Sequence, residues 1–290
     1  VDMYALNSRV NDLYFGILLL DEQLKQNALL QDELERNYRQ ITAYVENGIA
    51  NQADLDAVKV EQLNTKQKRV ELVSSRMAYL KMLSLLVGEK LSQETVLEKP
   101  VPQDDISAVG EIRRPELSLF NAQEVGLQVQ EKALNVRHLP QFGLFVQGAY
   151  GNPGLNMLKN EFSPYYIAGV RLSWNFGSLY TLKNDRKVIE NKRRQLDNNR
   201  DVFLFNTRLE MTQQDQAIQS LEKQMQDDDE IIRLRTNIRK SAEAKVANGT
   251  LTVTEMLREL TNESLARQSK ALHEIQRLMG IYQLKYTTND

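Results

Sequence analysis

The side chains that most often carry chemistry are few in this sequence, and they form no reactive pattern. There is no cysteine, which excludes thiol catalysis and disulfides. The two histidines, His138 and His273, are far apart and have no metal-ligand pattern near them. The HExxH, P-loop, GxSxG and GxGxxG motifs are all absent. The sequence therefore predicts a protein that is not an enzyme and that holds no metal or cofactor.

One run of acids, Asp227-Asp228-Asp229-Glu230, raises the question of a cation site. Side chains at successive helical positions point in different directions around the axis, so they do not converge on one ion. We therefore interpret the run as a solvated helix face.

A repeated turn is the more informative polar feature. Val45-Glu46-Asn47-Gly48 returns as Val246-Ala247-Asn248-Gly249, at an offset of 249 − 48 = 201 residues. Asn-Gly suits the left-handed residue that ends a helix. Three residues after each glycine stands a candidate N-cap, and three residues later an acid: Asn51 with Asp54, and Thr252 with Glu255. The second set is a good capping box and the first a weaker analogue. Each turn thus ends one helix and begins another.

Long helices must connect these turns. Only Gly16 interrupts the helical pattern from residue 1 to 47, and 178–248 contains neither glycine nor proline. At 1.5 Å per residue these segments reach ~70 Å and ~105 Å. Helices of such length need lateral partners along their whole course.

A heptad repeat supports that packing. Apolar residues recur seven apart in two series: Leu182, Ile189, Leu196 and Phe203, then Leu204, Met211, Ile218, Met225 and Ile232. The positions between them are often polar, as at Thr207, Gln214 and Asp228. A dimeric zipper would prefer leucine there. Because the apolar stripe is narrow and interrupted by polar residues, we expect helices packed side by side in the wall of a larger tube.

Between the helices lies a glycine-rich aromatic stretch, 139–176, that alternates with period two. One face of its first run carries Phe142, Leu144, Val146, Gly148 and Tyr150; one face of its second carries Tyr166, Ala168, Val170, Leu172, Trp174 and Phe176. Alternation of this kind predicts a β-hairpin. Each run is long enough for a tilted strand to cross a bilayer, and the aromatic residues gather near its ends. A hairpin packed on a soluble core is the alternative.

Composition excludes other classes. The formal net charge is −2, whereas a nucleic-acid-binding protein would present a basic face. No window approaches 18 apolar residues, so no transmembrane helix is expected.

The order of these elements predicts two structural repeats. The second occupies 115–290: a helix at 116–138, the hairpin at 140–177, a long helix at 178–247, a turn at 248–252 and a returning helix at 253–286. Residues 1–99 form the later part of the first repeat, with its turn at 47–51, and 100–114 form a connector. By the repeat offset, about 90 residues with a first hairpin are expected before Val1.

Several of these residues carry a resemblance to a known family, the TolC-like outer membrane efflux proteins. They are Arg114-Pro115-Glu116-Leu117, which opens the second repeat; Gly249-Thr250 before Val253-Thr254-Glu255-Met256-Leu257; Gly48 with Asp54-Leu55; and Ala168-Gly169-Val170-Arg171-Leu172-Ser173-Trp174. Their order and spacing are fairly specific, and the resemblance covers essentially the whole chain.

The resemblance implies a mainly α fold with a β-hairpin. Long antiparallel coiled-coil-like helices would build an α-barrel tunnel in the periplasm, and the strands would contribute to a trimeric transmembrane β-barrel in the outer membrane of a Gram-negative bacterium. A homotrimer in contact with outer-membrane lipid, a periplasmic adaptor protein and an inner-membrane transporter are the implied partners. The implied function is a passive export duct for efflux or type I secretion, gated at its periplasmic tip.

The resemblance also places the gate at the two turns. The residues concerned are Asn47, Gly48, Asp54, Asn248, Gly249, Thr250, Glu255 and Arg258. Asp54 and Glu255 match acids that narrow the pore in family members, but both also stand where a capping box would use them; capping is the favoured role, and one side chain can serve both. Arg258 stands where a second acid can occur, so an ion pair between Glu255 and Arg258 is an alternative. Leu251 stands where some members have a basic residue that locks the gate.

In the hairpin, the resemblance implies lipid contact for the apolar face and a position in the barrel lumen for Arg171 on the other. Within a soluble hairpin, Arg171 would instead pair locally. The competing function is a soluble periplasmic coiled-coil protein with a structural or adaptor role.

Overall fold

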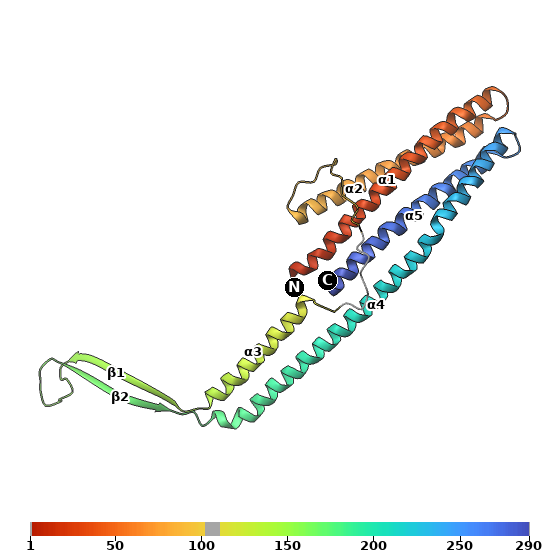
Figure 1. Ribbon diagram of the computed structural model, residues 1–290. Coiled ribbons are helices and arrows are strands. Elements are labelled where there is room, and N and C mark those ends of the chain that lie inside the picture. Colours follow the sequence, from red (N-terminus) through yellow and green to blue (C-terminus); the bar gives the residue numbers. More distant parts are fainter. Residues whose placement is uncertain (1, 102–110, 290) are drawn as a thin grey trace. The chain divides into compact units, whose positions relative to one another are not determined.

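The computed structural model describes residues 2–101 and 111–289, and these divide into two compact units. The first unit, the helical unit, comprises residues up to Pro115 together with Asn206 onward. The second, the hairpin unit, comprises Glu116–Phe205. Five helices and two strands make up the described residues (Figure 1). The fold is therefore mainly helical, with long antiparallel helices and one β-hairpin, as the sequence predicts.

The helical unit consists of two helical hairpins. The first pairs α1 (Asp2–Glu46) with α2 (Gln52–Val87); the second pairs the later part of α4 (Ser178–Ala247) with α5 (Val253–Thr288). The turns of the two hairpins lie at the same end of the unit (Figure 1). We call this end the tip.

Heptad spacing explains why α4 pairs with α5. From Met211 onward the less exposed residues of α4 recur three and four positions apart: Met211, Gln214, Ile218, Leu221, Met225, Asp228, Ile232, Arg235, Arg239, Ala242 and Val246. This spacing keeps one stripe of the helix facing its partner. The coiled-coil packing predicted for this helix is confirmed, including the polar members of its seam.

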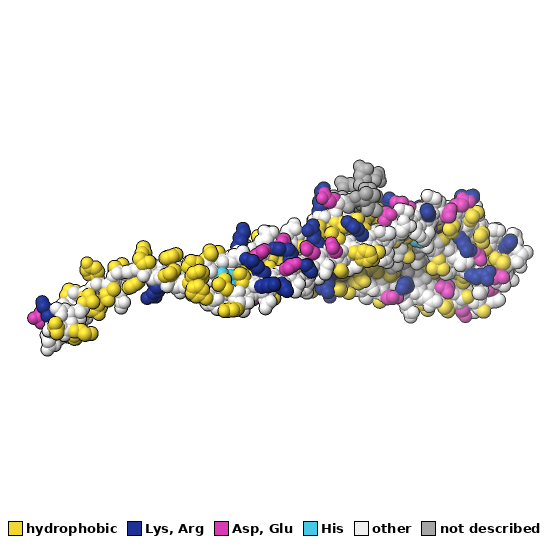
Figure 2. All heavy atoms as spheres, turned by 90° about the horizontal axis from the view of Figure 1, so that it is seen from below, with side chains coloured by type: hydrophobic (Ala, Val, Ile, Leu, Met, Phe, Trp, Pro, Cys, Tyr) yellow, Lys and Arg dark blue, Asp and Glu magenta, His cyan; other side chains and the backbone are white. Residues whose placement is uncertain are grey.

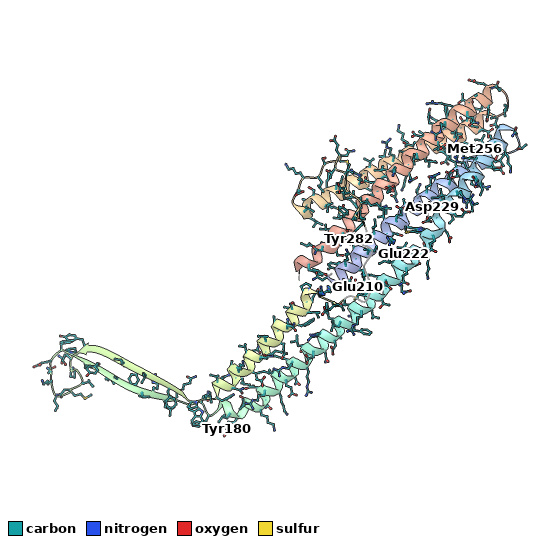
Figure 3. The ribbon with its side chains drawn as sticks, viewed as in Figure 1. Tyr180, Glu210, Glu222, Asp229, Met256 and Tyr282 are labelled. Carbon is teal, nitrogen blue, oxygen red and sulfur yellow. The ribbon has the colours of Figure 1, made fainter. Side chains whose placement is uncertain are left out.

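Apolar clusters hold the two helical hairpins together. At the tip, Leu34, Ile41 and Val58 of the first hairpin pack with a set from the second: Ala242, Val246, Val253, Met256, Leu257 and Leu260. Farther along, Phe15 and Leu18 of α1 pack against Ile275 and Leu278 of α5. Figure 3 labels Met256 and Tyr282, which mark these two levels on α5.

Polar contacts hold the segment that precedes the connector and the far end of the connector itself. Arg76 of α2 binds Asp21 of α1 and donates to the backbone oxygens of Gln93 and Thr95 at 2.8 and 2.7 Å. At the other end, the Arg113 amide donates to the Thr288 oxygen at 2.8 Å. Of the connector predicted at 100–114, residues 102–110 lie outside the described residues.

The hairpin unit pairs α3 (Pro115–Arg137) with the first part of α4 and carries the β-hairpin. Arg193 of α4 bridges Glu124 and Glu131 of α3 at 3.0 and 3.2 Å. The strands β1 (Gln141–Gly151) and β2 (Ser163–Ser173) form a two-stranded antiparallel sheet, with Phe142 opposite Leu172.

Candidate functional site

The two turns at the tip are built by the same set of backbone hydrogen bonds. Gly48 and Gly249 have φ of 69° and 65°, in the left-handed region that favours glycine. In each turn the glycine amide and the next amide donate to carbonyls of the last helical turn: Gly48 to Val45 and Ile49 to Tyr44, Gly249 to Val246 and Thr250 to Lys245. This is the Schellman motif.

The asparagines of the turns also act alike. The Asn47 side-chain amide donates to the Ala43 oxygen at 2.7 Å, and that of Asn248 to the Ala244 oxygen at 2.8 Å. Each carbonyl also accepts the backbone amide of the same asparagine, so the side chain adds a second hydrogen bond at the helix end. The repeat read from the sequence thus extends to individual hydrogen bonds.

Both returning helices begin with a complete capping box. The Asp54 amide donates to Asn51 Oδ1 at 3.0 Å, and the Asn51 amide donates to the Asp54 carboxylate at 3.1 Å. The corresponding distances between Glu255 and Thr252 are 3.2 and 3.1 Å. The box predicted at Thr252 is confirmed, and the first turn, expected to be a weaker analogue, forms an equally complete box.

The cap also sets the charge of Glu255. Hydrogen bonds from the hydroxyl and the backbone amide of Thr252 hold the pKa of the Glu255 carboxyl below its ordinary value. Glu255 is exposed and both hydrogen bonds reach its Oε2 atom. Capping therefore keeps this acid ionised at the solvent-facing tip, so the capping role and a role in lining a polar passage are compatible.

Arg258 takes a different partner from the one considered in the sequence. Its Nε lies 3.6 Å from Oε1 of Glu259, while the Glu255 carboxylate is engaged by Thr252. The positive charge of Arg258 lies near enough to help lower the pKa of the Glu255 carboxyl, without a hydrogen bond between them. The tip consequently presents an acid and a base within one helical turn.

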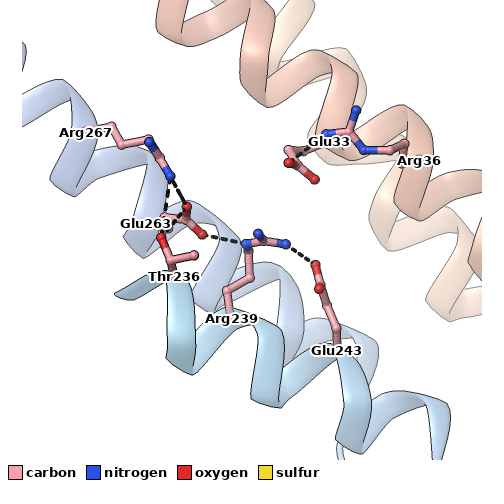
Figure 4. A network of polar contacts seen from close by, with 7 residues as sticks. All are labelled: Glu33, Arg36, Thr236, Arg239, Glu243, Glu263 and Arg267. Atoms are coloured by element: carbon pink, nitrogen blue, oxygen red, sulfur yellow. Dashed lines mark hydrogen bonds and ion pairs between the residues drawn. The ribbon is translucent and has the colours of Figure 1, made fainter. Parts of the chain in front are cut away.

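Below the tip, a buried group of charges joins α4 to α5 (Figure 4). Glu263 is buried and accepts hydrogen bonds from Arg239 at 2.5 Å, Arg267 at 2.6 Å and Thr236 at 2.9 Å. Arg239 also binds Glu243. We call these five residues the Glu263 network. Its acid is satisfied on both oxygens, which a buried carboxylate requires.

A polar cavity of about 260 Å³ separates this network from α1. On the α1 side, Glu33 and Arg36 form their own ion pair at 2.6 Å and line the same cavity (Figure 4). The ion pairs that line the cavity therefore form within each helical hairpin.

Further polar pairs join α5 to α4 farther from the tip. Asp228 is 5% exposed and lies 2.9 Å from His273; Asp229 lies 2.5 Å from Lys270, and Glu222 2.9 Å from Arg277. Figure 3 labels Glu222 and Asp229 on α4. For Asp228 the interpretation as part of a solvated face is wrong, because its heptad position turns it toward α5.

The pH dependence of stability should report the Glu263 network. Burial acts to raise the pKa of Glu263, but the hydrogen bonds from Arg267, Arg239 and Thr236 outweigh it, so the pKa lies below 4.5. A lowered folded pKa adds stability that is complete above pH 4.5 and is lost as pH falls through the folded value. We expect Glu263→Gln to be less stable than the parent at pH 7, with the difference in Tm shrinking below pH 4.5.

Circular dichroism melts between pH 7 and pH 3 measure this difference. Glu230→Gln is the matched control, because Glu230 also has a lowered pKa through its hydrogen bond from Arg233 but is fully exposed on α4. Equal changes of Tm with pH in the two variants would contradict a special contribution from the buried acid.

The β-hairpin brings the two predicted apolar faces together. The register pairs Phe142 with Leu172, Leu144 with Val170, and Gly148 with Tyr166, so these side chains share one face of the sheet. Trp174 and Phe176 lie beyond the end of β2, where their rings pack 4.4 Å apart and the Trp174 indole donates to the His138 oxygen. They therefore mark the base of the hairpin rather than its strands.

Arg171 lies on the opposite face of the sheet. Its guanidinium carbon is 5.4 Å from the centre of the Phe145 ring on the neighbouring strand, a cation–π distance. The cross-strand partner of Arg171 is Gly143.

Among residues 2–101 and 111–289 no three histidine, aspartate or glutamate side chains gather as metal ligands would. Within the same ranges, no helix combines the length and apolar character needed to cross a membrane.

Comparison with known proteins defines the class of fold. No protein-family model and no curated protein sequence matches the chain. Solved structures do match it over nearly all of its length, and they are outer-membrane channels. The chain therefore has the fold of the TolC-like channels, as the sequence resemblance implied.

Three structures illustrate the likeness. The outer membrane protein VceC of Vibrio cholerae is 13% identical, with a TM-score of 0.75 over 97% of this chain and 68% of VceC. The CmeC outer membrane channel of Campylobacter jejuni is 14% identical, with a TM-score of 0.72 over 99% of this chain and 64% of CmeC. CusC is 18% identical, with a TM-score of 0.77 over 97% of this chain and 67% of CusC. The chain thus spans about two thirds of the length of these channels.

Proposed function

We propose that the protein is the outer-membrane channel of a tripartite efflux or type I secretion system in a Gram-negative bacterium. It would be a passive duct rather than an enzyme. One observation carries the proposal: in a chain with this fold, the apolar face of the β-hairpin is uncovered. Six side chains on that face, Phe142, Leu144, Val146, Tyr166, Val170 and Leu172, are between 58% and 87% exposed. Figure 2 shows hydrophobic side chains gathered along the hairpin.

Lipid is the environment that suits such a face. Each strand has 11 residues. At about 3.3 Å per residue and a tilt of about 40°, such a strand crosses about 28 Å, close to the apolar band of an outer-membrane barrel. Two strands alone leave open edges, which a bilayer does not tolerate. The proposed assembly is therefore a homotrimer with a twelve-stranded barrel. Each complete copy would give four strands, two from this hairpin and two from the first hairpin expected before Val1.

The gate of the proposed duct is the tip. The residues of the two turns and their caps would stand where the helical hairpins of three copies converge: Asn47, Gly48, Asp54, Asn248, Gly249, Thr250, Glu255 and Arg258. The apolar packing beneath the tip joins the helical hairpins without an ion pair across the cavity lined by Glu33 and Glu263. An outward splay at the tip would then break mainly the apolar contacts of this cluster. A periplasmic adaptor and an inner-membrane transporter would dock there.

Single-channel recording of the complete protein in planar bilayers tests the proposal. We expect a small resting conductance that rises when the tip acids are neutralised by Asp54→Asn and Glu255→Gln, changes that preserve the capping hydrogen bonds. Asp56→Asn, an exposed acid outside the cap, is the control. A protein that inserts but conducts in none of these forms would refute the duct.

A further inference from the structure

The loop between the strands, residues 152–162, exposes apolar side chains at the end of the hairpin away from its base. Met157 is 88% exposed and Leu158 96%, with Leu155 at 62% and Phe162 at 65%. Scattered exposed apolar residues are ordinary, but four within one short loop mark an interaction surface. The strands already supply enough length for the lipid core, so this loop lies beyond it.

The loop is ordered by its own contacts. At its neck the two arms lie close together: a Cβ on Gly154 would be 2.4 Å from Ser163 Oγ, so a larger residue there would require the Ser163 side chain to move. At its end, the Leu158 amide donates to Asn156 Oδ1 at 3.1 Å and the Lys159 amide donates to the Asn156 oxygen at 3.2 Å. These bonds present Met157 and Leu158 in a fixed turn, which lowers the entropy lost on binding.

Phe162 secures the returning arm. Its ring stacks on that of Tyr150 in β1, with centroids 5.7 Å apart and 23° between the planes. The apolar end is therefore carried on a preorganised loop.

We propose that this loop binds the same loop of the other copies and closes the outer mouth of the channel with an apolar plug of Met157 and Leu158 side chains. The inference rests on the proposed trimeric channel. In a three-fold symmetric ring, one side of each loop contacts the opposite side of the loop in the next copy. Lys159 and Glu161 give the loop one charge of each sign beside its apolar end. Such a surface is complementary to a second copy of itself.

Dimensions allow the three loops to meet. Twelve strands about 4.8 Å apart and tilted by about 40° enclose a ring of about 12 Å radius. Half of the loop, about five residues, reaches up to about 16 Å. The end of each loop can thus reach the axis, where the plug is incomplete without the partners' side chains.

Cysteine cross-linking in the complete protein tests this inference, and residues 1–290 contribute no cysteine of their own. Under mild oxidation in outer membranes, we expect Leu158→Cys to form disulfide-linked dimers within trimers. Leu144→Cys is the matched control: it is 87% exposed in the single chain but is proposed to face lipid, so it should stay monomeric on denaturing gels.

A second readout is labelling by a maleimide-polyethylene glycol added to intact cells. We expect Leu158→Cys to react at least about tenfold more slowly than in the denatured protein, as a buried site does. Rapid labelling without cross-links would overturn the plug. Slow labelling without cross-links, relieved by detergent, would assign the loop to lipid and overturn it too. If no variant formed trimers or conducted ions, the result would instead refute the proposed channel on which the inference rests.

Discussion

Replacing Arg239 by methionine is expected to lower the free energy of unfolding by about 3 kcal/mol. Removing one partner of a buried ion pair leaves the other charge without compensation, at a cost of about 3–5 kcal/mol. The lower end applies here because Arg267 still donates to Glu263 at 2.6 Å. The side chains of Arg239 and Glu263 are 12% and 7% exposed, so water replaces little of the lost contact. Urea unfolding followed by circular dichroism measures the change.

Two further variants test whether the loss of stability comes from breaking the buried ion pair. Arg233→Met removes an exposed partner of Glu230 on the same helix, and surface pairs contribute little, so its stability should stay close to that of the parent. The double variant Arg239→Met/Glu263→Leu removes both charges and should be more stable than Arg239→Met alone. If Arg239→Met is no more damaging than Arg233→Met, the Glu263 network does not hold α4 to α5.

No local motif in the sequence predicts the Glu263 network, but the spacing of its residues from the turn does. In an antiparallel helical hairpin, residues equally far from the turn face each other. Arg239 and Glu263 lie equally far on either side of Leu251, and Asp228 and His273 nearly so. Listing charges by distance from each Asn-Gly turn would have found both pairs. Local motifs cannot, because each charge alone resembles an ordinary solvated position.

The acidic run shows two sequence rules in conflict. Local reading assigns all its acids to solvent, whereas the heptad places Asp228 in the seam. The structure follows the heptad: Asp228 is 5% exposed. Packing of a long helix fixes the orientation of every residue on it, so the long-range period outweighs local composition.

The turns were predictable because their signals are local. A left-handed glycine and a capping box need only a few adjacent residues of the right type, and Gly48, Gly249 and Thr252 provide them. The full box at Asn51 was underestimated, although asparagine and aspartate supply the same acceptors as threonine and glutamate.

The end of β2 was harder to place. Alternation continues through Trp174 and Phe176, yet the strand stops at Ser173. The residue that would lie opposite Trp174 in this register is Pro140, which precedes the start of β1 at Gln141. Pairing ends there, and Trp174 turns to donate to the His138 oxygen. Side-chain alternation alone does not record where a partner strand can begin.

If the protein forms the proposed membrane-inserted trimer, Val170→Lys and Leu172→Lys are expected to destabilise it by about 2–4 kcal/mol each at mid-bilayer, and less toward the interface. Both side chains lie on the apolar face, at 69% and 58% exposure in the single chain. A soluble coiled-coil protein would tolerate both changes, because an exposed lysine in water costs little. Loss of heat-stable trimers, scored by the temperature at which they dissociate on gels, measures the effect.

Ser173→Lys provides the matched control, since it places the same charge next to Leu172 but on the opposite face. In a barrel that face looks into the polar lumen beside Arg171, so the trimer should keep its dissociation temperature. If lysine at 170, 172 and 173 has the same small effect, the apolar face does not contact lipid and the soluble alternative stands. If only 170 and 172 are damaging, the alternation of β2 divides lipid from lumen, and the exposure of the face is explained by the bilayer that covers it.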